Sequence, residues 1–204
     1  YTPLGYENYD ISPATLETVD FSNIVYRIAC RNPYSYNLVD YGRDLGVMLM
    51  GDIDKYFHYD FAVTNGSIPC KDDNNNTKDI YASVTIKPFK NFNVKATYNW
   101  GEYNPQALAG GTAPGIGVSK YMPMNRFVVG AWYNDPNGLD LRAEYGFMKS
   151  DKGGDTYVDE QGAYVLAGYH AGKFLPIVRW DMYKDDVNKT SAGCNYNRIL
   201  VGCT

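Results

Sequence analysis

Charged residues of opposite sign recur at every second position in two stretches of this sequence. Asp140, Arg142 and Glu144 form one set, and Arg179 and Asp181 form the other. Because side chains two residues apart in an extended strand point to the same face, each set would place opposite charges side by side on one surface. Such a surface can line a water-filled passage and tune which ions enter it, or it can stiffen a wall as a ladder of salt bridges. The spacing is compatible with both roles.

Catalytic and metal-binding patterns are weak in this chain. His58 and His170 are the two histidines, and no Gly-x-Ser-x-Gly turn or comparable nucleophile setting accompanies them. The oxygen-rich run from Asp72 to Asn76 lacks the glycine and the distal glutamate of a calcium-binding loop, which favours a solvated turn. We therefore expect no enzymatic activity, no cofactor and no bound metal.

Apolar residues at every second position predict about ten β-strands that would carry these charged sets. In one of them, Leu141 and Ala143 share one face while Asp140 and Arg142 share the other. The clearest segments are Leu45 to Met50, Tyr56 to Thr64, Asp79 to Lys87, Phe92 to Trp100, Phe127 to Asn134, Leu139 to Met148, Gly162 to His170 and Phe174 to Tyr183. This pattern predicts an all-β fold with one apolar face and one polar face.

The connections between these strands alternate between long and short. The short ones are Asp52 to Asp54, Pro88 to Asn91, Asp135 to Asn137 and Ala171 to Lys173, and the long ones are Asn65 to Lys78, Gly101 to Asn125, Lys149 to Gln161 and Lys184 to Asn195. A transmembrane antiparallel β-barrel has this construction, with tight periplasmic turns and long extracellular loops. A soluble β-sandwich also alternates along its strands, but its turns have no reason to sort by length.

Composition bounds the class of protein further. The chain has 204 residues, 45% of them hydrophobic, and a formal net charge of −4, so a nucleic-acid partner is not expected. No apolar run approaches the roughly 20 residues of a transmembrane helix. The 20 tyrosines suit a membrane interface, although tyrosine is also a good strand former. We expect a single domain over residues 1–204, with a loop or constriction segment at 1–20 and strands over 21–204. We also expect it to be an internal segment of a longer protein.

The four cysteines show no zinc-ligand spacing. They are Cys30, Cys70, Cys194 and Cys203. Cys30 and Cys70 both lie beside connections that we place on the same side of the barrel, which makes them the candidate disulfide in an oxidising compartment. Free buried cysteines are an equally compatible alternative.

Several short sequences in this order resemble one known family. Tyr41-Gly42-Arg43-Asp44-Leu45-Gly46-Val47 is similar to a strand of the phosphate-selective porin family (the O/P type) of Gram-negative outer membranes. Similar words follow at Asn65-Gly66, Lys78-Asp79, Lys87-Pro88, Leu141 to Tyr145, Gly162 to Tyr164 and Pro176 to Asp181. The resemblance covers most of residues 40 to 185 and implies a barrel of about 16 or more strands, of which this chain forms part.

The resemblance also implies a function and a setting. It implies passive diffusion of small hydrophilic solutes or ions, a trimeric or larger assembly, and contact with outer-membrane lipid and lipopolysaccharide. The charged residues expected to line the lumen are Asp44, Asp60, Lys87, Lys95, Asp140, Arg142, Glu144, Arg179 and Asp181. Their mixed signs do not predict phosphate specificity. Two alternatives remain, namely a porin-like barrel acting as a structural subunit of an outer-membrane complex, and a soluble secreted β-sandwich that binds glycans.

Overall fold

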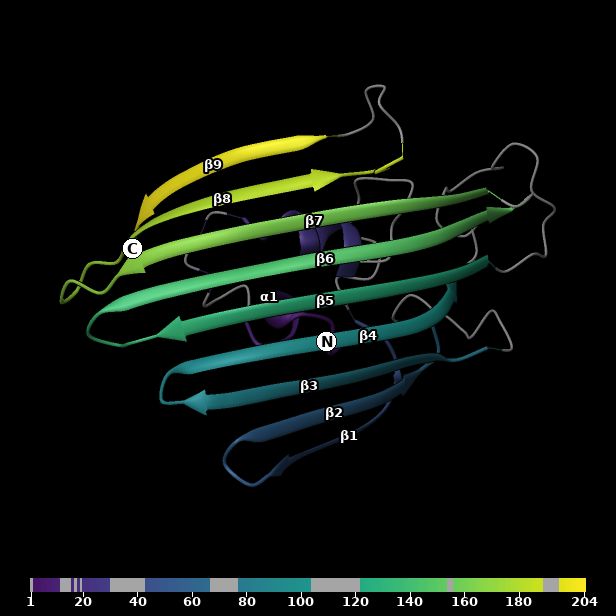
Figure 1. Cartoon of the computed structure of the whole chain (residues 1–204), viewed down its shortest axis with the longest axis horizontal. Helices are drawn as coiled ribbons and strands as arrows, with labels where there is room; N and C mark the ends of the chain where they lie inside the picture. The colour runs from purple at the N-terminus through teal and green to yellow at the C-terminus, as the bar shows by residue number, and fades with distance from the viewer. Residues whose placement is uncertain are drawn as a thin grey trace.

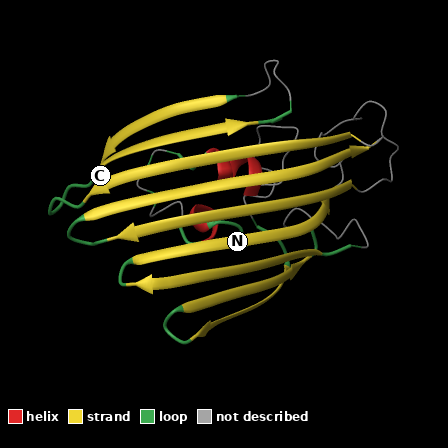
Figure 2. Ribbon diagram, viewed as in Figure 1, coloured by secondary structure: helices red, strands yellow, loops and turns green. Residues whose placement is uncertain are grey.

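In the computed structural model of this chain, the described residues are 2–11, 16, 18, 20–29, 43–66, 77–103, 122–153, 156–188 and 195–204. They form one antiparallel sheet of nine strands, in which each strand pairs with its neighbour in the sequence. Two short helical elements lie against one face of this sheet (Figure 1, Figure 2). The predicted all-β class is therefore confirmed. The sheet is open among the described residues, so its closure into a barrel stays a prediction.

The strands occur in the predicted order, with shifts at their ends. They are β1 (Gly46–Ile53), β2 (Phe57–Thr64), β3 (Asp79–Phe89), β4 (Phe92–Tyr103), β5 (Met122–Asn134), β6 (Leu139–Gly153), β7 (Thr156–Tyr169), β8 (Pro176–Lys184) and β9 (Tyr196–Cys203). Because β1 continues to Ile53, the first tight turn covers residues 54–56 instead of Asp52 to Asp54.

The largest correction concerns the long connection predicted from Lys149 to Gln161. β6 continues to Gly153 and β7 begins at Thr156, so only residues 154 and 155 separate the two strands. The other three connections on that side remain long, at 65–78, 104–121 and 185–195. They leave the sheet at the end opposite the tight turns (Figure 1). Sorting of the connections by length therefore holds everywhere except between β6 and β7.

The tight turns are built from residues that tolerate the left-handed backbone region. Asp54 and Asn91 have φ values of 58° and 67°, and short polar side chains adopt such values more readily than other non-glycine residues. Gly172 has a φ of 67° in the turn between β7 and β8. In the turn between β5 and β6, the Asp135 carboxylate accepts the backbone N–H of Asn137 at 3.1 Å. These local interactions explain why the short connections were readable from the sequence.

Exposure of side chains on the two faces of the sheet is the reverse of that in a soluble protein. Large apolar side chains on one face are exposed, including Val84 at 48%, Leu141 at 42% and Trp180 at 40%. Charged side chains on the other face are buried, and Arg126 and Arg179 are both fully enclosed. Arginine is almost never fully buried unless it is paired, so something must cover and satisfy this face.

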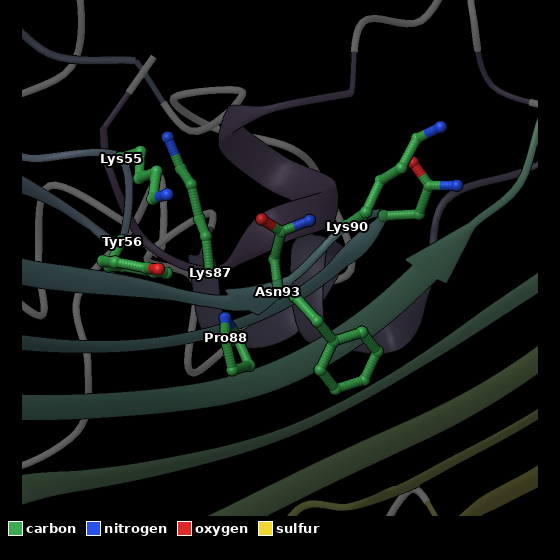
Figure 3. A pocket seen from close by; sticks show the side chains of 8 residues that line it. Lys55, Tyr56, Lys87, Pro88, Lys90 and Asn93 are labelled. Atoms are coloured by element: carbon green, nitrogen blue, oxygen red, sulfur yellow. The ribbon is translucent and has the colours of Figure 1, made fainter.

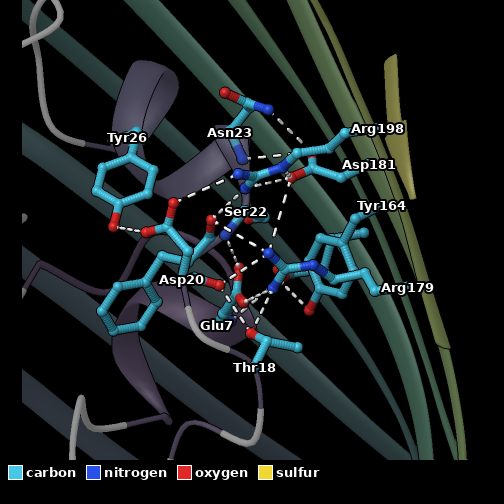
Figure 4. Close-up of polar contacts among 12 residues, drawn as sticks. Glu7, Thr18, Asp20, Ser22, Asn23, Tyr26, Tyr164, Arg179, Asp181 and Arg198 are labelled. Carbon is cyan, nitrogen blue, oxygen red and sulfur yellow. Dashed lines mark hydrogen bonds and ion pairs between the residues drawn. The ribbon is translucent and has the colours of Figure 1, made fainter. Parts of the chain in front are cut away.

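The covering element is the N-terminal segment, by which we mean the described residues from 2 to 29. It contains the helix α1 (Tyr6–Tyr9) and the π-helix η1 (Ile24–Ala29). Strands had been predicted from residue 21 onward, so the π-helix at residues 24–29 is a departure from that prediction. The sheet curls around the segment (Figure 1, Figure 4). Among the described residues, no helix is both long and apolar enough to cross a membrane.

Two glycines make room for the π-helix on the polar face. A Cβ atom at Gly146 of β6 would lie 2.9 Å from Cδ1 of Ile28, and one at Gly162 of β7 would lie 3.2 Å from Cγ1 of Ile24. Gly146 and Gly162 are paired across the two strands, so together they form one shallow notch. Ile24 and Ile28 belong to the buried apolar cluster that joins the segment to the sheet. The sheet therefore has room for η1 at this pair of glycines.

Candidate functional site

Pairing of the strands places ionisable side chains in rows across the polar face. One row runs across β2 to β9 through His58, Thr85, Lys95, Gly130, Glu144, Tyr164, Asp181 and Arg198. The adjacent row contains Arg142 and Arg179, which are joined through Leu166 of β7. The sequence had placed these charges on a common face, and the observed register brings them to neighbouring levels of the sheet.

Arg179 is the central anchor of the N-terminal segment (Figure 4). Its Nη1 donates to Oε1 of Glu7 at 3.1 Å and to the hydroxyl of Thr18 at 2.8 Å. Its Nη2 donates to the carbonyl oxygens of Asp20 at 2.8 Å and Phe21 at 3.3 Å. One arginine of β8 therefore holds two separate parts of the segment, and hydrogen bonds replace the water that its charge would lose on burial.

Asp181 and Arg198 extend this anchor to the last strand. The Asp181 carboxylate accepts the backbone N–H of Asn23 at 3.3 Å and two donors of Arg198 at 3.0 and 2.9 Å. Arg198 also donates to the carbonyl oxygen of Phe21 at 2.8 Å. Arg198 was missed by sequence analysis. The available signal was its position opposite Asp181, which becomes visible only when the register of β8 with β9 is known.

Glu144 of β6 binds the start of α1. Its carboxylate accepts the backbone N–H groups of Tyr6 at 2.6 Å and Glu7 at 3.0 Å, together with the hydroxyl of Tyr164 at 2.8 Å. Gly5 precedes this helix with a φ of 82°, and a Cβ atom there would lie 2.9 Å from Oε1 of Glu144. Three donors thus satisfy a carboxylate that is only 4% exposed.

A second group of charges on the polar face contains one pair within β6 and one contact with the segment. Arg142 makes a bidentate contact with Asp140 at 2.9 and 2.6 Å, both residues lying on β6. Lys95 of β4 donates to Asp10 of the segment at 2.8 Å and lies 4.4 Å from the ring centre of Tyr9. The pairs predicted as a pore lining therefore also act as a structural ladder in this arrangement, which was the other role that the spacing allowed.

Arg126 of β5 was also missed by sequence analysis. It is fully buried and donates to the carbonyl oxygens of Ile28 at 3.1 Å and Ala29 at 2.9 Å. These carbonyls lie at the C-terminal end of η1, where a positive charge is favourable. Two further donors reach Asn99 at 2.8 Å and Tyr81 at 2.7 Å. Arg126 escaped notice because the strand had been predicted to begin one residue later, at Phe127, so this position was not assigned to a strand.

The three remaining predicted lumen residues lie on or beside β1 to β3. Asp44 precedes β1 and accepts the hydroxyl of Thr64 and the backbone N–H of Gly66, so it joins the start of β1 to the end of β2. Asp60 of β2 is buried and lies 3.1 Å from the ring of His58. Lys87 of β3 pairs with Asp52 at 3.1 Å, where both side chains are substantially exposed.

The end of the sheet with the tight turns contains two open cavities. One cavity of about 430 Å³ lies between the first two turns (Figure 3), and its lining is Lys55, Tyr56, Lys87, Pro88, Phe89, Lys90, Asn91 and Asn93. A neighbouring cavity of about 300 Å³ is lined by Asp10, Asp52, His58, Thr85, Lys87, Asn93, Lys95 and Trp132. Lys87 and Asn93 belong to both, so the two cavities are contiguous. We call the first one the lysine pocket.

Burial changes the acidity of two residues in the N-terminal segment. Desolvation raises the pKa of the Glu7 carboxyl from 4.5 to about 7, although the Ser22 amide and Arg179 act in the opposite direction. Burial and a hydrogen bond to Asp20 raise the pKa of the Tyr26 hydroxyl to about 12. The first of these values lies close to neutral pH, so the charge of the docked Glu7 depends on pH in the physiological range.

Metal-binding and cysteine sites can be assessed only for the residues that the structure describes. No group of three or more His, Cys, Asp or Glu side chains in these parts of the chain is arranged to hold a metal ion. Cys203 is the described cysteine, and its thiol is free and exposed. The candidate pair Cys30 and Cys70 lies outside the described residues. No family model, curated protein or solved structure was found to match this chain.

Proposed function

We propose that this chain forms part of the wall of an outer-membrane β-barrel porin. The observation that carries the proposal is the reversal of the two faces, with exposed apolar side chains on one and buried charges on the other. Lipid would cover the apolar face, and the polar face would surround the lumen. A soluble glycan-binding sandwich would instead bury its apolar face against a second sheet, and the described residues contain a single sheet.

The family proposed for this barrel is the phosphate-selective (O/P type) porin family of Gram-negative outer membranes. Support comes from the positions in the fold of the short sequence motifs that resemble this family. Arg43-Asp44-Leu45-Gly46-Val47 leads into the first strand, Leu141 to Tyr145 lies within β6, and Pro176 to Asp181 lies within β8. We further propose that the wall is completed by additional strands, that the barrel forms oligomers, and that it contacts lipid and lipopolysaccharide.

Passive diffusion of small hydrophilic solutes or ions is the transport function that we propose. The N-terminal segment contacts the polar face from β4 to β9, so it would narrow the lumen as a constriction. The uncovered part of the lumen would include the lysine pocket at the periplasmic mouth. Its lysines, Lys55, Lys87 and Lys90, give this mouth a positive potential that would favour entry of anions.

Conductance in a planar lipid bilayer tests the transport function. The purified full-length protein is expected to insert and to produce stepwise, voltage-independent current increments in potassium chloride. Liposome swelling in sugars of increasing size would then give the width of the passage. Protein that inserts and is folded but gives neither current nor swelling would contradict the porin proposal.

A structural subunit with a filled lumen is the second candidate function. It is favoured by the N-terminal segment, which buries Arg142, Glu144 and Arg179 and leaves them no contact with passing solutes. The same bilayer experiment distinguishes the two, because a filled barrel would insert without conducting. If the protein dissolves and remains monomeric without detergent, both membrane functions fail and the secreted sandwich is the remaining interpretation.

A further inference from the structure

Glu7 is an acidic side chain of the N-terminal segment that is buried against the sheet. It is 4% exposed, whereas the side chains of Asp10 and Asp20 are 38% and 40% exposed. Its Oε1 accepts Nη1 of Arg179 at 3.1 Å, and its Oε2 accepts the backbone N–H of Ser22 at 2.9 Å. Glu7 therefore connects α1, the approach to η1 and strand β8 in a single contact (Figure 4).

Charged and titratable groups face Glu7 from each strand that packs against it. β6 contributes Glu144, which accepts the backbone N–H of Glu7 at 3.0 Å, and β7 contributes Tyr164, which donates to Glu144. β8 contributes Arg179 together with Asp181, whose carboxylate lies 3.9 Å from Arg179. The nearby charges of the remaining elements are Arg142 on β6, Arg198 on β9 and Asp20 in the segment.

The balance of these groups makes an ionised Glu7 costly. Glu144 already has three donors, and Asp181 is already paired with Arg198. Among the described residues, the cation bonded to Glu7 is Arg179, which also donates to Thr18 and two backbone carbonyls. A charged Glu7 would thus add a second carboxylate beside Glu144 in a buried site, whereas a neutral Glu7 would not.

We propose that Glu7 is a proton-linked latch, which holds the N-terminal segment against the wall more tightly at acidic pH than at neutral or alkaline pH. The direction follows from linkage. An undocked Glu7 has an ordinary pKa of 4.5, and the docked one has a pKa of about 7. Between these values the docked state carries the extra proton, so docking weakens as pH rises through this window. The docking equilibrium would change by roughly a hundredfold across it, at about tenfold for each pKa unit.

Hydrogen exchange of the segment tests the latch on the membrane-inserted protein. The backbone N–H groups of Tyr6, Glu7 and Ser22 donate into the Glu144 and Glu7 carboxylates, so their protection reports docking. After correction for the intrinsic exchange rates, wild-type protection is expected to fall markedly between about pH 5 and pH 8. Glu7→Gln, which is permanently neutral, should remain protected throughout. Asp10→Asn removes an exposed charge from the same segment and should keep the wild-type pH dependence.

A second measurement keeps the proposal falsifiable if Glu7→Gln fails to fold. Infrared spectra of the wild-type protein should contain the C=O stretch of a protonated carboxyl group that disappears near pH 7. Equal pH dependence in wild type and Glu7→Gln, or wild-type protection that does not change with pH, would overturn the latch.

The consequence for transport rests on the proposed pore. If residues 2–29 constrict a conducting lumen, bilayer conductance should rise with pH in wild type and stay constant in Glu7→Gln. A protein that shows pH-dependent protection without any conductance would contradict the pore and support the latch. A conducting protein with pH-independent protection would do the reverse.

Discussion

The guanidinium of Arg179 donates to the carboxylate of Glu7 at 3.1 Å, although 172 positions of sequence separate the two residues. Both side chains are buried, so this contact joins the N-terminal segment to β8 away from water. Arg179 had been expected to face an open lumen. In this arrangement it faces the polar side of the sheet, as expected, but contacts residues of its own chain there.

Loss of Arg179 should undock the segment. In Arg179→Met, the docked segment would lose the donors to Glu7, Thr18 and two backbone carbonyls, and each buried acceptor left unpaired costs about 1–3 kcal/mol. We expect residues 2–29 to become sensitive to protease while the sheet stays folded. Lys149→Met is the matched control, because it removes a cation from an exposed position of β6 whose contact is with the ring of Tyr157. Equal protease sensitivity in both variants would show that Arg179 is not the anchor.

The features of this structure that could be predicted are those determined by residues close together in the sequence. In β6, alternation alone assigns Leu141 and Arg142 to opposite faces, because the side-chain period of a strand is two. The same rule identified the charged residues that share the polar face. The tight turns were predicted as short gaps between alternating segments, and Asp54 and Asn91 within two of them adopt the left-handed backbone region that such residues tolerate. None of these inferences needs knowledge of a distant residue.

The parts that could not be predicted depend on long-range contacts. No pattern in residues 24–29 predicted a π-helix. Its side chains pack where Gly146 and Gly162, on strands distant in the sequence, leave room for them. Arg126 and Arg198 gain their roles only when they meet the carbonyl groups of the segment. The degree of burial of the charged face was likewise hidden, because periodicity assigns a side chain to a face but does not tell what covers it.

An arginine on the exposed apolar face should destabilise the inserted protein. Val84→Arg and Leu141→Arg would each place a charge against lipid, which costs roughly 2–4 kcal/mol near the bilayer midplane. Asn93→Arg is the control, since Asn93 lines the open cavities on the polar face. The free energy of unfolding in lipid vesicles measures the difference. A larger loss in Asn93→Arg would mean that the two faces are assigned the wrong way round.

The tolerant positions on the polar face are fewer than alternation suggests. Alternation alone places Thr85 and Thr97 on the polar face, where arginine would be expected to cost little. They are only 6% and 1% exposed, and the hydroxyl of Thr97 donates to Ser83 at 3.1 Å. Arginine at either position would overpack the contact with the neighbouring strand, so we now expect destabilisation there as well.

Filling the glycine notch should displace the π-helix. The double variant Gly146→Ala, Gly162→Ala places methyl groups within 2.9 and 3.2 Å of the Ile28 and Ile24 side chains, closer than ordinary contact. We expect faster hydrogen exchange in residues 24–29 and a cost of about 1–3 kcal/mol. Gly202→Ala is the matched control, because its new methyl would meet Ile177 at an ordinary 3.5 Å. Unchanged exchange in the double variant would show that the helix has other room.

The lysine pocket should set the preference for anions at the mouth. Replacing Lys55, Lys87 and Lys90 by methionine removes the positive charge of the pocket lining and should shift the reversal potential in a salt gradient toward cations. Lys173→Met is the control, because Lys173 is exposed in the turn between β7 and β8, outside the lysine pocket. An equal shift in the control, or no shift in the triple variant, would show that this pocket does not determine the ion preference.

The two ends of the sheet should lie on opposite sides of the outer membrane. Lys78 and Asn188 are exposed at the end with long connections, whereas Asn137 and Lys173 are exposed at the end with tight turns. Short turns face the periplasm in outer-membrane barrels, and long loops face the exterior. Single cysteines are placed at these four positions after the native cysteines are replaced by serine. Lys78→Cys and Asn188→Cys should then react with a membrane-impermeant maleimide on intact cells.

The cysteines at the tight turns supply the internal control for this topology. Asn137→Cys and Lys173→Cys are as exposed as the other pair in the protein itself, so they should react fully once the cells are lysed and not before. Because antiparallel strands send successive connections to opposite ends of the sheet, one labelled position at each end fixes the orientation of all nine strands. Labelling of Asn137→Cys on intact cells, with Lys78→Cys reacting only after lysis, would reverse the orientation. Equal labelling of all four on intact cells would contradict membrane insertion.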